Sequence, residues 1–462
     1  MNLFDTVAAI STPYGKGGVA LIRISGADAV SVAEKVFSPF SGKPLSELAH
    51  GKMTYGEIFM PTPERKSVDD GMAVIFRAPH SFTGEDTVEI TCHGGILVTR
   101  KVFSAVLLAG ARAAEAGEFT RRAYVSGRMK LTEAESLGDL LEARSESQLT
   151  LARSGMKGRL SSKIDELYSL LRRVLSGIYA VIDFPDEDLS DMSREEMLTA
   201  LEGINKSILK LAATYGTGKA VNEGIPTVIC GRANAGKSSI YNRILGYDAA
   251  IVTEVEGTTR DVLREVAVVG KTTLLLCDTA GIRSTEDKVE SIGIERSLRE
   301  IDAAGLILAV FDGTRELDDE DRALISRISE SGRAAIALVN KSDVCACKEL
   351  AELESSFSHI IKISASTGDG FEEFERVLEE LFIDGEIDIE NDAVVTGARQ
   401  YSALMSSADI LNRVISDIAS GMSLDACCVD VECAMAALGE VDGREIGEEI
   451  VAEIFSRFCV GK

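Results

Sequence analysis

One segment of nine residues limits this chain more than any other part of it. Residues 231–239 read G-R-A-N-A-G-K-S-S and fit the pattern G-x-x-x-x-G-K-[ST]. The run Thr227–Cys230 before them is mostly apolar and predicts a buried strand, while apolar residues after them recur at helical spacing. In a strand–loop–helix unit of this kind, backbone N–H groups and the helix N-terminus surround phosphates. The segment therefore predicts an α/β unit that binds a nucleoside triphosphate.

Different residues of the loop 231–239 would contact the phosphates and the Mg²⁺ ion. Lys237 would reach the terminal phosphates, and the Ser238 hydroxyl would bind Mg²⁺. The predicted nucleotide contacts in this loop are Asn234, Ala235, Gly236, Lys237, Ser238 and Ser239.

Three later segments predict that the nucleotide carries guanine. Each follows a strand-like run: D-T-A-G at 278–281, N-K-S-D at 340–343 and S-A-S at 364–366. Asp278 would lie near Mg²⁺, where hard oxygen ligands are required. A carboxylate at Asp343 can accept both N–H groups of a guanine edge. The predicted contacts are Asp278, Thr279, Ala280, Gly281, Asn340, Lys341, Asp343, Ser364, Ala365 and Ser366.

Hydrolysis must proceed without the glutamine that many GTPases carry directly after D-x-x-G, because that position here is Ile282. The side-chain oxygen of Asn234 could hold K⁺, although a plain loop residue is the simpler interpretation. The segment 253–261 offers hydroxyls and carbonyls for such a site, and Thr259 is the natural second Mg²⁺ hydroxyl. On local grounds Glu290 looks like a solvated helix-opening residue.

The remaining composition sets broad limits. A chain of 462 residues exceeds what one core usually serves, so two or three domains are expected. A net charge of −25 argues against broad nucleic-acid binding and leaves only local RNA contacts. No signal peptide or apolar run of membrane-spanning length is found, and nine scattered cysteines suit reduced thiols, so we expect a cytoplasmic protein without membrane contact.

Periodicity divides the chain further. Residues 1–120 read as an N-terminal α/β domain, with strands at 19–24, 72–76 and 88–92 and a helix at 96–108. Residues 121–220 and 385–462 read as helices, and both flank the nucleotide-binding segment 221–384. Neither flank can readily bury its apolar stripe alone, so we expect both to form one helical domain into which a Ras-like nucleotide domain is inserted. Three domains in sequence is the alternative.

The apolar stripes of the two helical flanks step by four and three residues. The first flank carries Leu160, Ile164, Leu167, Leu171, Val174 and Ile178. The second carries Leu424, Cys428, Val431, Met435 and Leu438, continued by Ile450, Ile454 and Phe458.

With these motifs assembled, the whole chain resembles the MnmE (TrmE) family of tRNA-modification GTPases. Segments outside the nucleotide motifs carry the specific part of the resemblance. They read R-I-S-G at 23–26, S-F-T-G-E-D-T-V-E-I-T-C-H-G-G at 81–95, G-E-F-T-R-R-A-Y at 117–124, I-D-F-P-D-E at 182–187 and F-S-R-F-C-V-G-K at 455–462.

The resemblance implies a folate-binding N-terminal domain that also dimerises, and a K⁺-stimulated GTPase domain. It implies a homodimer that forms a heterotetramer with an MnmG (GidA)-type flavoprotein. Together they would add an aminomethyl or carboxymethylaminomethyl group to carbon 5 of the wobble uridine of certain tRNAs. The one-carbon donor would be a tetrahydrofolate derivative, in its 5,10-methylene or 5-formyl form.

The resemblance also implies roles for particular residues. The K⁺ ligands would be Asn234, Thr253, the carbonyl of Val255 and Thr258. Ser238 and Thr259 would bind Mg²⁺. Further nucleotide contacts would come from Thr253, Glu254, Val255, Glu256, Gly257, Thr258 and Thr259. Glu290 would position the water network for hydrolysis. The folate contacts would be Arg23, Glu89, Arg128 and Lys462.

Three points qualify the match. Position 233 is Ala where the family often has Pro, and Arg128 stands where Lys is common, so the charge survives with a different hydrogen-bond geometry. Cys459 lies where the family has a cysteine associated with the modification reaction, and a packed structural thiol is the alternative. The alternative for the whole chain is a regulatory GTPase switch in ribosome or RNA assembly, which would need a basic RNA-binding module.

Overall fold

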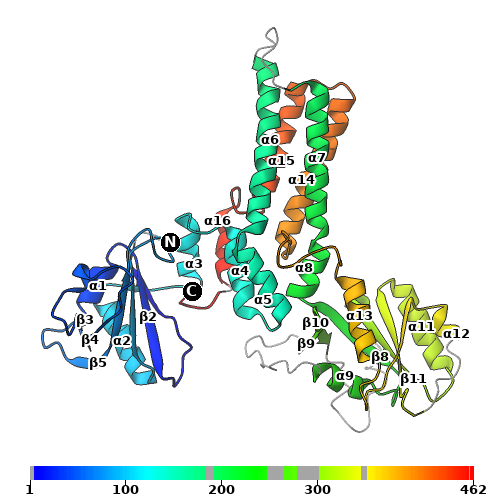
Figure 1. Cartoon of the computed structure of the whole chain (residues 1–462), viewed down its shortest axis with the longest axis horizontal. Helices are drawn as coiled ribbons and strands as arrows, with labels where there is room; N and C mark the ends of the chain where they lie inside the picture. Colours follow the sequence, from blue (N-terminus) through cyan, green and yellow to red (C-terminus); the bar gives the residue numbers. More distant parts are fainter. Residues whose placement is uncertain are drawn as a thin grey trace. The chain divides into compact units, whose positions relative to one another are not determined.

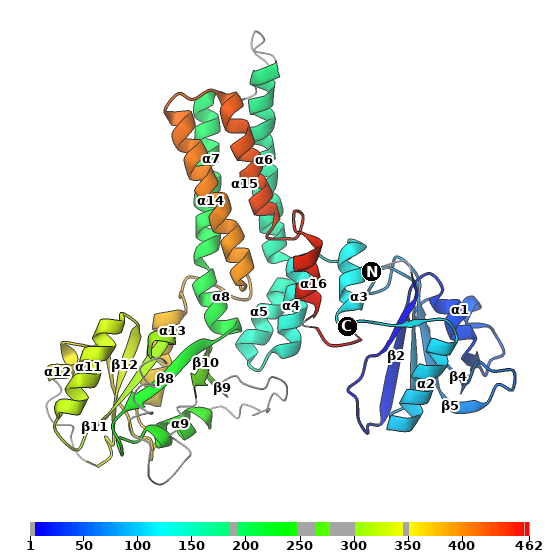
Figure 2. The ribbon, with the colours of Figure 1, turned by 180° about the vertical axis from the view of Figure 1, so that it is seen from behind.

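The computed structural model describes residues 5–183, 192–246, 264–277, 301–344, 351–456 and 458–461 (Figures 1 and 2). Contacts divide the chain into two compact units. The N-terminal unit consists of residues 1–138 and 442–462, and the second unit is residues 139–441. The domain boundaries expected from the sequence stay a prediction.

A seven-stranded sheet forms the centre of the N-terminal unit. Its order is β3 (Phe37–Pro39), β4 (Thr54–Phe59), β5 (Ser67–Phe76), β6 (Thr87–His93), β2 (Val19–Ser25), β1 (Val7–Ile10) and β7 (Arg112–Ala113). Helices α1 (Ala29–Glu34) and α2 (Ile96–Leu108) and the short 3₁₀ helix η1 (Leu45–Glu47) complete this part. The predicted strands are confirmed as parts of β2, β5 and β6, and the predicted helix at 96–108 is confirmed as α2.

Alternation along the strands gives the sheet two different faces. On β2, Ala20, Ile22 and Ile24 are buried in the same cluster as Val102 and Val106 of α2. The residues between them on β2 therefore point to the opposite side, because successive side chains of a strand alternate. That opposite side, called the open face below, carries Leu21 and Arg23 in β2.

Three helices and the residues after them complete the N-terminal unit: α3 (Glu118–Val125), α4 (Leu131–Glu142) and α16 (Glu448–Ser456). Leu131 of α4 packs with Val451 and Phe455 of α16. The predicted stripe is wrong at Ile450, which is exposed, whereas Ile454 and Phe458 are partly buried against this cluster, Phe458 from beyond the end of the helix. The buried positions are displaced by one residue, which is about 100° on a helix.

Helices from both helical flanks form one core in the second unit. The helices are α5 (Glu146–Met156), α6 (Arg159–Asp183), α7 (Arg194–Ala213), α8 (Tyr215–Asn222), α14 (Ala398–Ala419) and α15 (Leu424–Gly439). All six predicted stripe residues of α6 are buried there together with Val431 and Leu438 of α15. The prediction of one helical domain built from two chain segments is confirmed, and three domains in sequence is wrong.

The inserted segment is a doubly wound α/β domain. Its six-stranded sheet has the order β13 (His359–Lys362), β12 (Ala334–Asn340), β11 (Leu306–Asp312), β8 (Ile225–Gly231), β10 (Thr272–Cys277) and β9 (Arg264–Val269). Its helices are α9 (Lys237–Leu245), α11 (Asp319–Ser331), α12 (Ala351–Glu354) and α13 (Phe371–Phe382). Only β9 runs antiparallel to its neighbour among these strands, so the carboxyl ends of the others meet at one edge.

Among the helices that the structure describes, none is long and apolar enough to cross a membrane.

Candidate functional site

The phosphate loop connects β8 to α9, as the sequence predicts. Gly231 and Gly236 both have positive φ, +147° and +99°. A Cβ on Gly236 would clash with the side-chain amide of Asn340, and one on Gly231 would clash with the carbonyl of Val310. Only glycine therefore allows the loop to pass this close to the ends of β11 and β12.

Lys237 lies folded over its own loop. Its Nζ donates to the carbonyl oxygens of Gly231 at 2.8 Å and Arg232 at 2.7 Å. Burial lowers the pKa of Lys237, because burial disfavours the charged amine. The cation is thus held at the loop backbone, from where it can turn to an incoming phosphate.

Asn340 joins three parts of the nucleotide site. Its Nδ2 donates to the carbonyl of Ala235 in the phosphate loop at 2.9 Å, and its Oδ1 accepts from the backbone N–H of Ala365 at 3.1 Å. This buried amide therefore fixes the distance between the phosphate loop and both predicted guanine segments.

Two hydroxyls hold the carboxylate that would read guanine. The Ser364 hydroxyl donates to Oδ1 of Asp343 at 2.7 Å, and the Ser366 hydroxyl donates to Oδ2 at 3.1 Å. The hydrogen bond from Ser364, more than any other contact, lowers the pKa of Asp343. Each oxygen keeps a further lone pair, so the carboxylate can still accept two N–H groups.

The sequence did not predict an ion pair that Lys341, in the same N-K-S-D segment, forms with the end of β11. Nζ of Lys341 is 2.6 Å from Oδ2 of Asp312, the last residue of β11. Burial by itself would raise the pKa of Asp312, but hydrogen bonds from Lys341 and Thr314 hold it at about 2. The sequence did hold a signal for this pair, because Asp312 is a polar residue at the end of an apolar strand. Neighbouring parallel strands end at the same edge of a sheet, which places Asp312 near the residues that follow β12.

The rest of the predicted nucleotide and ion site is only partly described. Asn234 has φ of +63° and an exposed side chain, and Ser238 and Ser239 are exposed at the start of α9. The other predicted residues lie outside the described residues: Thr253, Glu254, Val255, Glu256, Gly257, Thr258, Thr259, Asp278, Thr279, Ala280, Gly281, Glu290 and Lys462.

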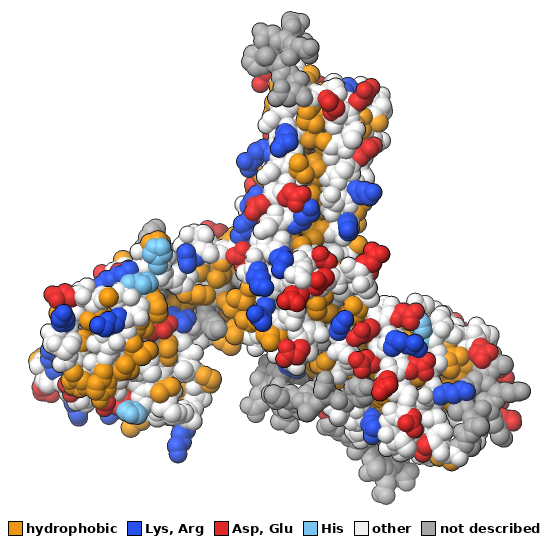
Figure 3. Space-filling model, viewed as in Figure 1, with side chains coloured by type: hydrophobic (Ala, Val, Ile, Leu, Met, Phe, Trp, Pro, Cys, Tyr) orange, Lys and Arg blue, Asp and Glu red, His pale blue; other side chains and the backbone are white. Residues whose placement is uncertain are grey.

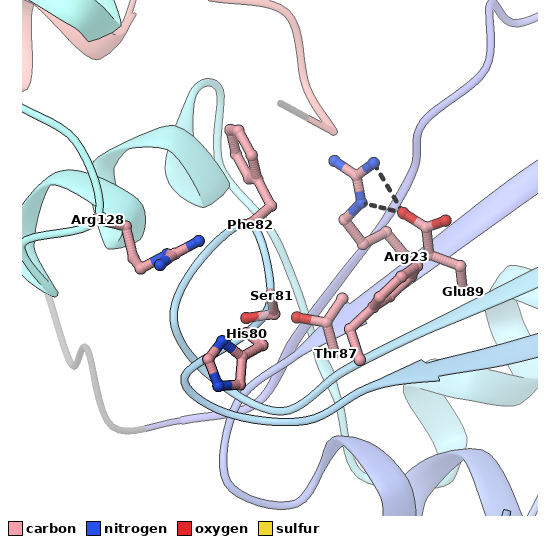
Figure 4. A pocket seen from close by; sticks show the side chains of 8 residues that line it. Arg23, His80, Ser81, Phe82, Thr87, Glu89 and Arg128 are labelled. Carbon is pink, nitrogen blue, oxygen red and sulfur yellow. Dashed lines mark hydrogen bonds and ion pairs between the residues drawn. The ribbon is translucent and has the colours of Figure 1, made fainter. Parts of the chain in front are cut away.

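A second site lies in the N-terminal unit (Figure 4). A cavity of about 400 Å³ brings together three of the residues predicted to contact folate, Arg23, Glu89 and Arg128. The remaining lining residues are Phe76, His80, Ser81, Phe82 and Thr87. Charged, hydroxyl and aromatic groups thus converge on one cavity of a size typical for small-molecule ligands.

The Arg23–Glu89 pair organises this cavity. Nε and Nη2 of Arg23 both lie 2.8 Å from Oε1 of Glu89, on the neighbouring strand β6. The guanidinium carbon also lies 5.8 and 5.6 Å from the ring centroids of Phe82 and Phe119. Its position is therefore fixed by three neighbouring side chains before any ligand binds.

The loop that contributes Ser81 and Phe82 is anchored by a buried cation. Arg122, whose side chain is 2% exposed, contacts the carboxylates of Glu85, Asp5 and Glu118 at 2.8–3.1 Å. The motif at 81–95 contains Ser81, Phe82 and Thr87, but the pattern alone did not single them out as lining residues. His93, in the same motif, instead lies beside Asp69, with Nδ1 2.8 Å from Oδ1.

Cys459 differs from the cysteines of the strands. Burial raises the pKa of Cys92 to about 11 and that of Cys230 to about 12, so both stay protonated thiols. Cys459 is exposed and forms no disulfide. The alternative of a packed structural thiol is therefore wrong for this residue.

Comparison with known proteins covers nearly the whole chain. The model of the family "GTP-binding protein TrmE N-terminus" matches residues 6–128, and that of the "MnmE helical domain" matches residues 131–459. Proteins named tRNA modification GTPase MnmE are similar over almost all of both chains. The one from Symbiobacterium thermophilum is 39% identical over 460 residues, covering 99% of each chain. The one from Ligilactobacillus salivarius is 40% identical, covering 99% of this chain and 98% of the relative. The one from Geobacter metallireducens is also 40% identical and covers 100% of both chains.

Proposed function

The chain belongs to the MnmE family of tRNA modification GTPases, and we propose that it couples GTP hydrolysis to a folate-dependent modification of the wobble uridine. As a member it is a GTP hydrolase with a role in tRNA modification. The proposal goes further: with an MnmG (GidA)-type flavoprotein, it adds an aminomethyl or carboxymethylaminomethyl group to carbon 5. The observation that supports it most directly is the cavity shared by Arg23, Glu89 and Arg128.

The residues of this cavity suit a reduced folate. A folate carries a pterin ring with adjacent N–H groups, and a carboxylate such as that of Glu89 can accept hydrogen bonds from them. Its glutamate end is anionic and complements the exposed guanidinium of Arg128, which forms no ion pair with any residue that the structure describes. The ring of Phe82 offers a surface for stacking. The folate would supply the one-carbon unit, in the 5,10-methylene or 5-formyl form, and Lys462 is proposed as a further contact.

We propose that Cys459 takes part in the modification step. Its thiol is exposed. It belongs to the same unit as the cavity, and the thiolate is the nucleophilic form of cysteine.

For hydrolysis we propose two ions, Mg²⁺ and K⁺, and one carboxylate, that of Glu290, which would position the attacking water. Ser238 and Thr259 would hold Mg²⁺. Asn234 would hold K⁺ together with Thr253, Val255 and Thr258, and its exposed amide at a positive φ leaves the oxygen free to turn toward the phosphates. K⁺ would then meet charge that develops between the phosphates, which is the role of an arginine finger in other GTPases.

A homodimer through the N-terminal unit is the proposed assembly. On the open face, Tyr55, Met72, Thr91 and Leu21 are paired across four neighbouring strands. Tyr55 is 51% exposed and packs on Phe40, which is 61% exposed. Figure 3 shows hydrophobic side chains gathered on the visible face of this unit. Such a patch suits a second copy of the chain, and the heterotetramer with the flavoprotein would add to it.

The proposed location is the cytoplasm, where tRNA, folate and the flavoprotein would meet this chain. The names of the relatives favour tRNA modification over the alternative of a switch in ribosome or RNA assembly.

Titration of the full chain with 5-formyl-tetrahydrofolate tests the folate proposal. We expect saturable binding by the wild-type chain, and binding weaker by roughly tenfold to a hundredfold in Arg23→Ala, because Glu89 then loses its partner. Arg100→Ala is the matched control, since Arg100 is exposed on α2. Isothermal titration calorimetry measures the affinities, and no binding by the wild-type chain would refute the proposal.

The ion proposal predicts a dependence on the monovalent cation. GTP turnover in K⁺ should exceed turnover in Na⁺ by about tenfold or more, because the smaller ion fits a site of this kind less well. Asn234→Ala should remove the difference, whereas Asn242→Ala, an exposed asparagine of α9, should keep it. Phosphate release in matched chloride salts measures both. Equal turnover of the wild-type chain in the two salts would contradict the K⁺ site.

A further inference from the structure

Residues 458–461, called the tail segment here, lie at the edge of the cavity described above. Val460 forms an antiparallel β-bridge with Ala116, and the backbone N–H of Gly117 donates to the carbonyl of Cys459 at 3.4 Å. The carbonyl of Gly461 accepts from Nη1 of Arg23 at 3.3 Å and from the hydroxyl of Ser11 at 3.2 Å. Residues far away in the sequence thus hold the tail segment in place.

Arg23 belongs to the cavity and to this contact at once. Its Nε and Nη2 contact Glu89 inside the cavity, while Nη1 contacts the Gly461 carbonyl. Because one rigid guanidinium makes both contacts, it cannot move toward one partner without weakening its contact with the other. A change in the cavity at Glu89 therefore alters the contact of Arg23 with Gly461, and a change at Gly461 alters its contact with Glu89.

The backbone at Gly461 approaches the N-terminal strand closely. Its φ is +99°, and an added Cβ would lie 2.7 Å from the carbonyl oxygen of Ile10 and 3.0 Å from Cα of Ser11. Any other residue would meet both backbone strain and a clash with backbone atoms. Docking of the tail segment in this position therefore requires glycine at 461.

We propose that Ser11 is a positioning residue: with Arg23 it holds the Gly461 carbonyl and so fixes the tail segment, including Cys459, at the edge of the cavity. Since Arg23 is shared, ligand binding in the cavity and docking of the tail segment stabilise each other. By thermodynamic linkage, the factor by which docking raises ligand affinity equals the factor by which the ligand raises docking. This inference rests on the proposed function, in that the ligand is a reduced folate.

The test compares full-length variants in titrations with 5-formyl-tetrahydrofolate. Ser11→Ala removes one hydrogen bond and should weaken binding by about three- to tenfold, while Ser11→Thr keeps the hydroxyl and should restore it. Gly461→Ala should weaken binding by about tenfold or more. Gly421→Ala is its matched control, because Gly421 has φ of +91° with open space around it. GTP turnover should be unchanged in all four.

Hydrogen exchange of the tail segment supplies a readout that a general loss of stability would not reproduce. We expect the folate to slow exchange at residues 458–461 in the wild-type chain, and to slow it less in Ser11→Ala. Wild-type affinity in both Ser11→Ala and Gly461→Ala, or a tail segment whose exchange ignores the folate, would overturn this inference alone. Absence of folate binding by the wild-type chain would overturn the proposed function, and this inference with it.

Discussion

Asp343→Asn should reverse the nucleotide preference from GTP to xanthosine triphosphate. Guanine would present two N–H groups to the carboxylate of Asp343, which the hydroxyls of Ser364 and Ser366 hold in place. An asparagine there offers one acceptor and one donor, which suits xanthine, because xanthine has a carbonyl in place of the amino group. We expect GTP affinity to fall and xanthosine triphosphate affinity to rise, each on the order of 10²-fold, as for a site that loses a matched hydrogen-bond partner.

Competition titration against a fluorescent guanine nucleotide measures this change. Asp319→Asn is the matched control, since Asp319 is a fully exposed carboxylate on α11 whose one ion pair within the described part of the chain is with Arg322, at 3.5 Å. Thermal melting of both variants shows whether the fold is kept. A variant that loses GTP without gaining xanthosine triphosphate would mean that Asp343 supports the loop and does not read the base.

Glu290→Ala should keep nucleotide binding and lose GTP hydrolysis by a factor on the order of 10² or more. Ile282 cannot orient a water, so another group must do so. Glu290 follows Asp278 by twelve residues, at the position where the family resemblance implies a carboxylate that positions the water network. Its loss would remove an interaction of the transition state and leave ground-state binding unchanged.

Single-turnover phosphate release, with nucleotide affinity measured separately, distinguishes the two effects. Glu290→Gln keeps hydrogen bonding without the charge and should retain part of the activity. Glu330→Ala, a change of an exposed glutamate on α11, should hydrolyse GTP like the wild-type chain. Turnover by Glu290→Ala within about threefold of the wild type would mean that Glu290 has no role in hydrolysis and is a solvated helix residue.

Periodic patterns predicted elements well where one face of the element is buried. The helix Ile96–Leu108 and the stripe from Leu160 to Ile178 were both correct, because burial of one face imposes the spacing. The same reasoning failed at Ile450. In a helix of nine residues that packs through Val451 and Phe455, two adjacent apolar residues compete for one buried position, and only the neighbouring helices decide between them.

The sequence motifs predicted a nucleotide site at strand ends, and the phosphate loop does lie between β8 and α9 in the part of the chain that the structure describes. What the motifs could not show is how side chains are paired across strands. The pair of Lys341 with Asp312 joins residues 29 positions apart, and the hold of Ser366 on Asp343 depends on the loop after β13. These contacts follow from which strands are neighbours in the sheet, and local spacing does not contain that information.

By itself the sequence predicted a phosphate-binding loop at 231–239, and its motifs identified the family. Only the tertiary structure decided that Arg23, Glu89 and Arg128 line one cavity and that Ser11 and Gly461 meet at its edge. The physical reason is strand register: a shift by one residue would turn Arg23 or Glu89 to the helix-covered side of the sheet. The pairing of β2 with β6 fixes that register through contacts between residues far apart in the chain.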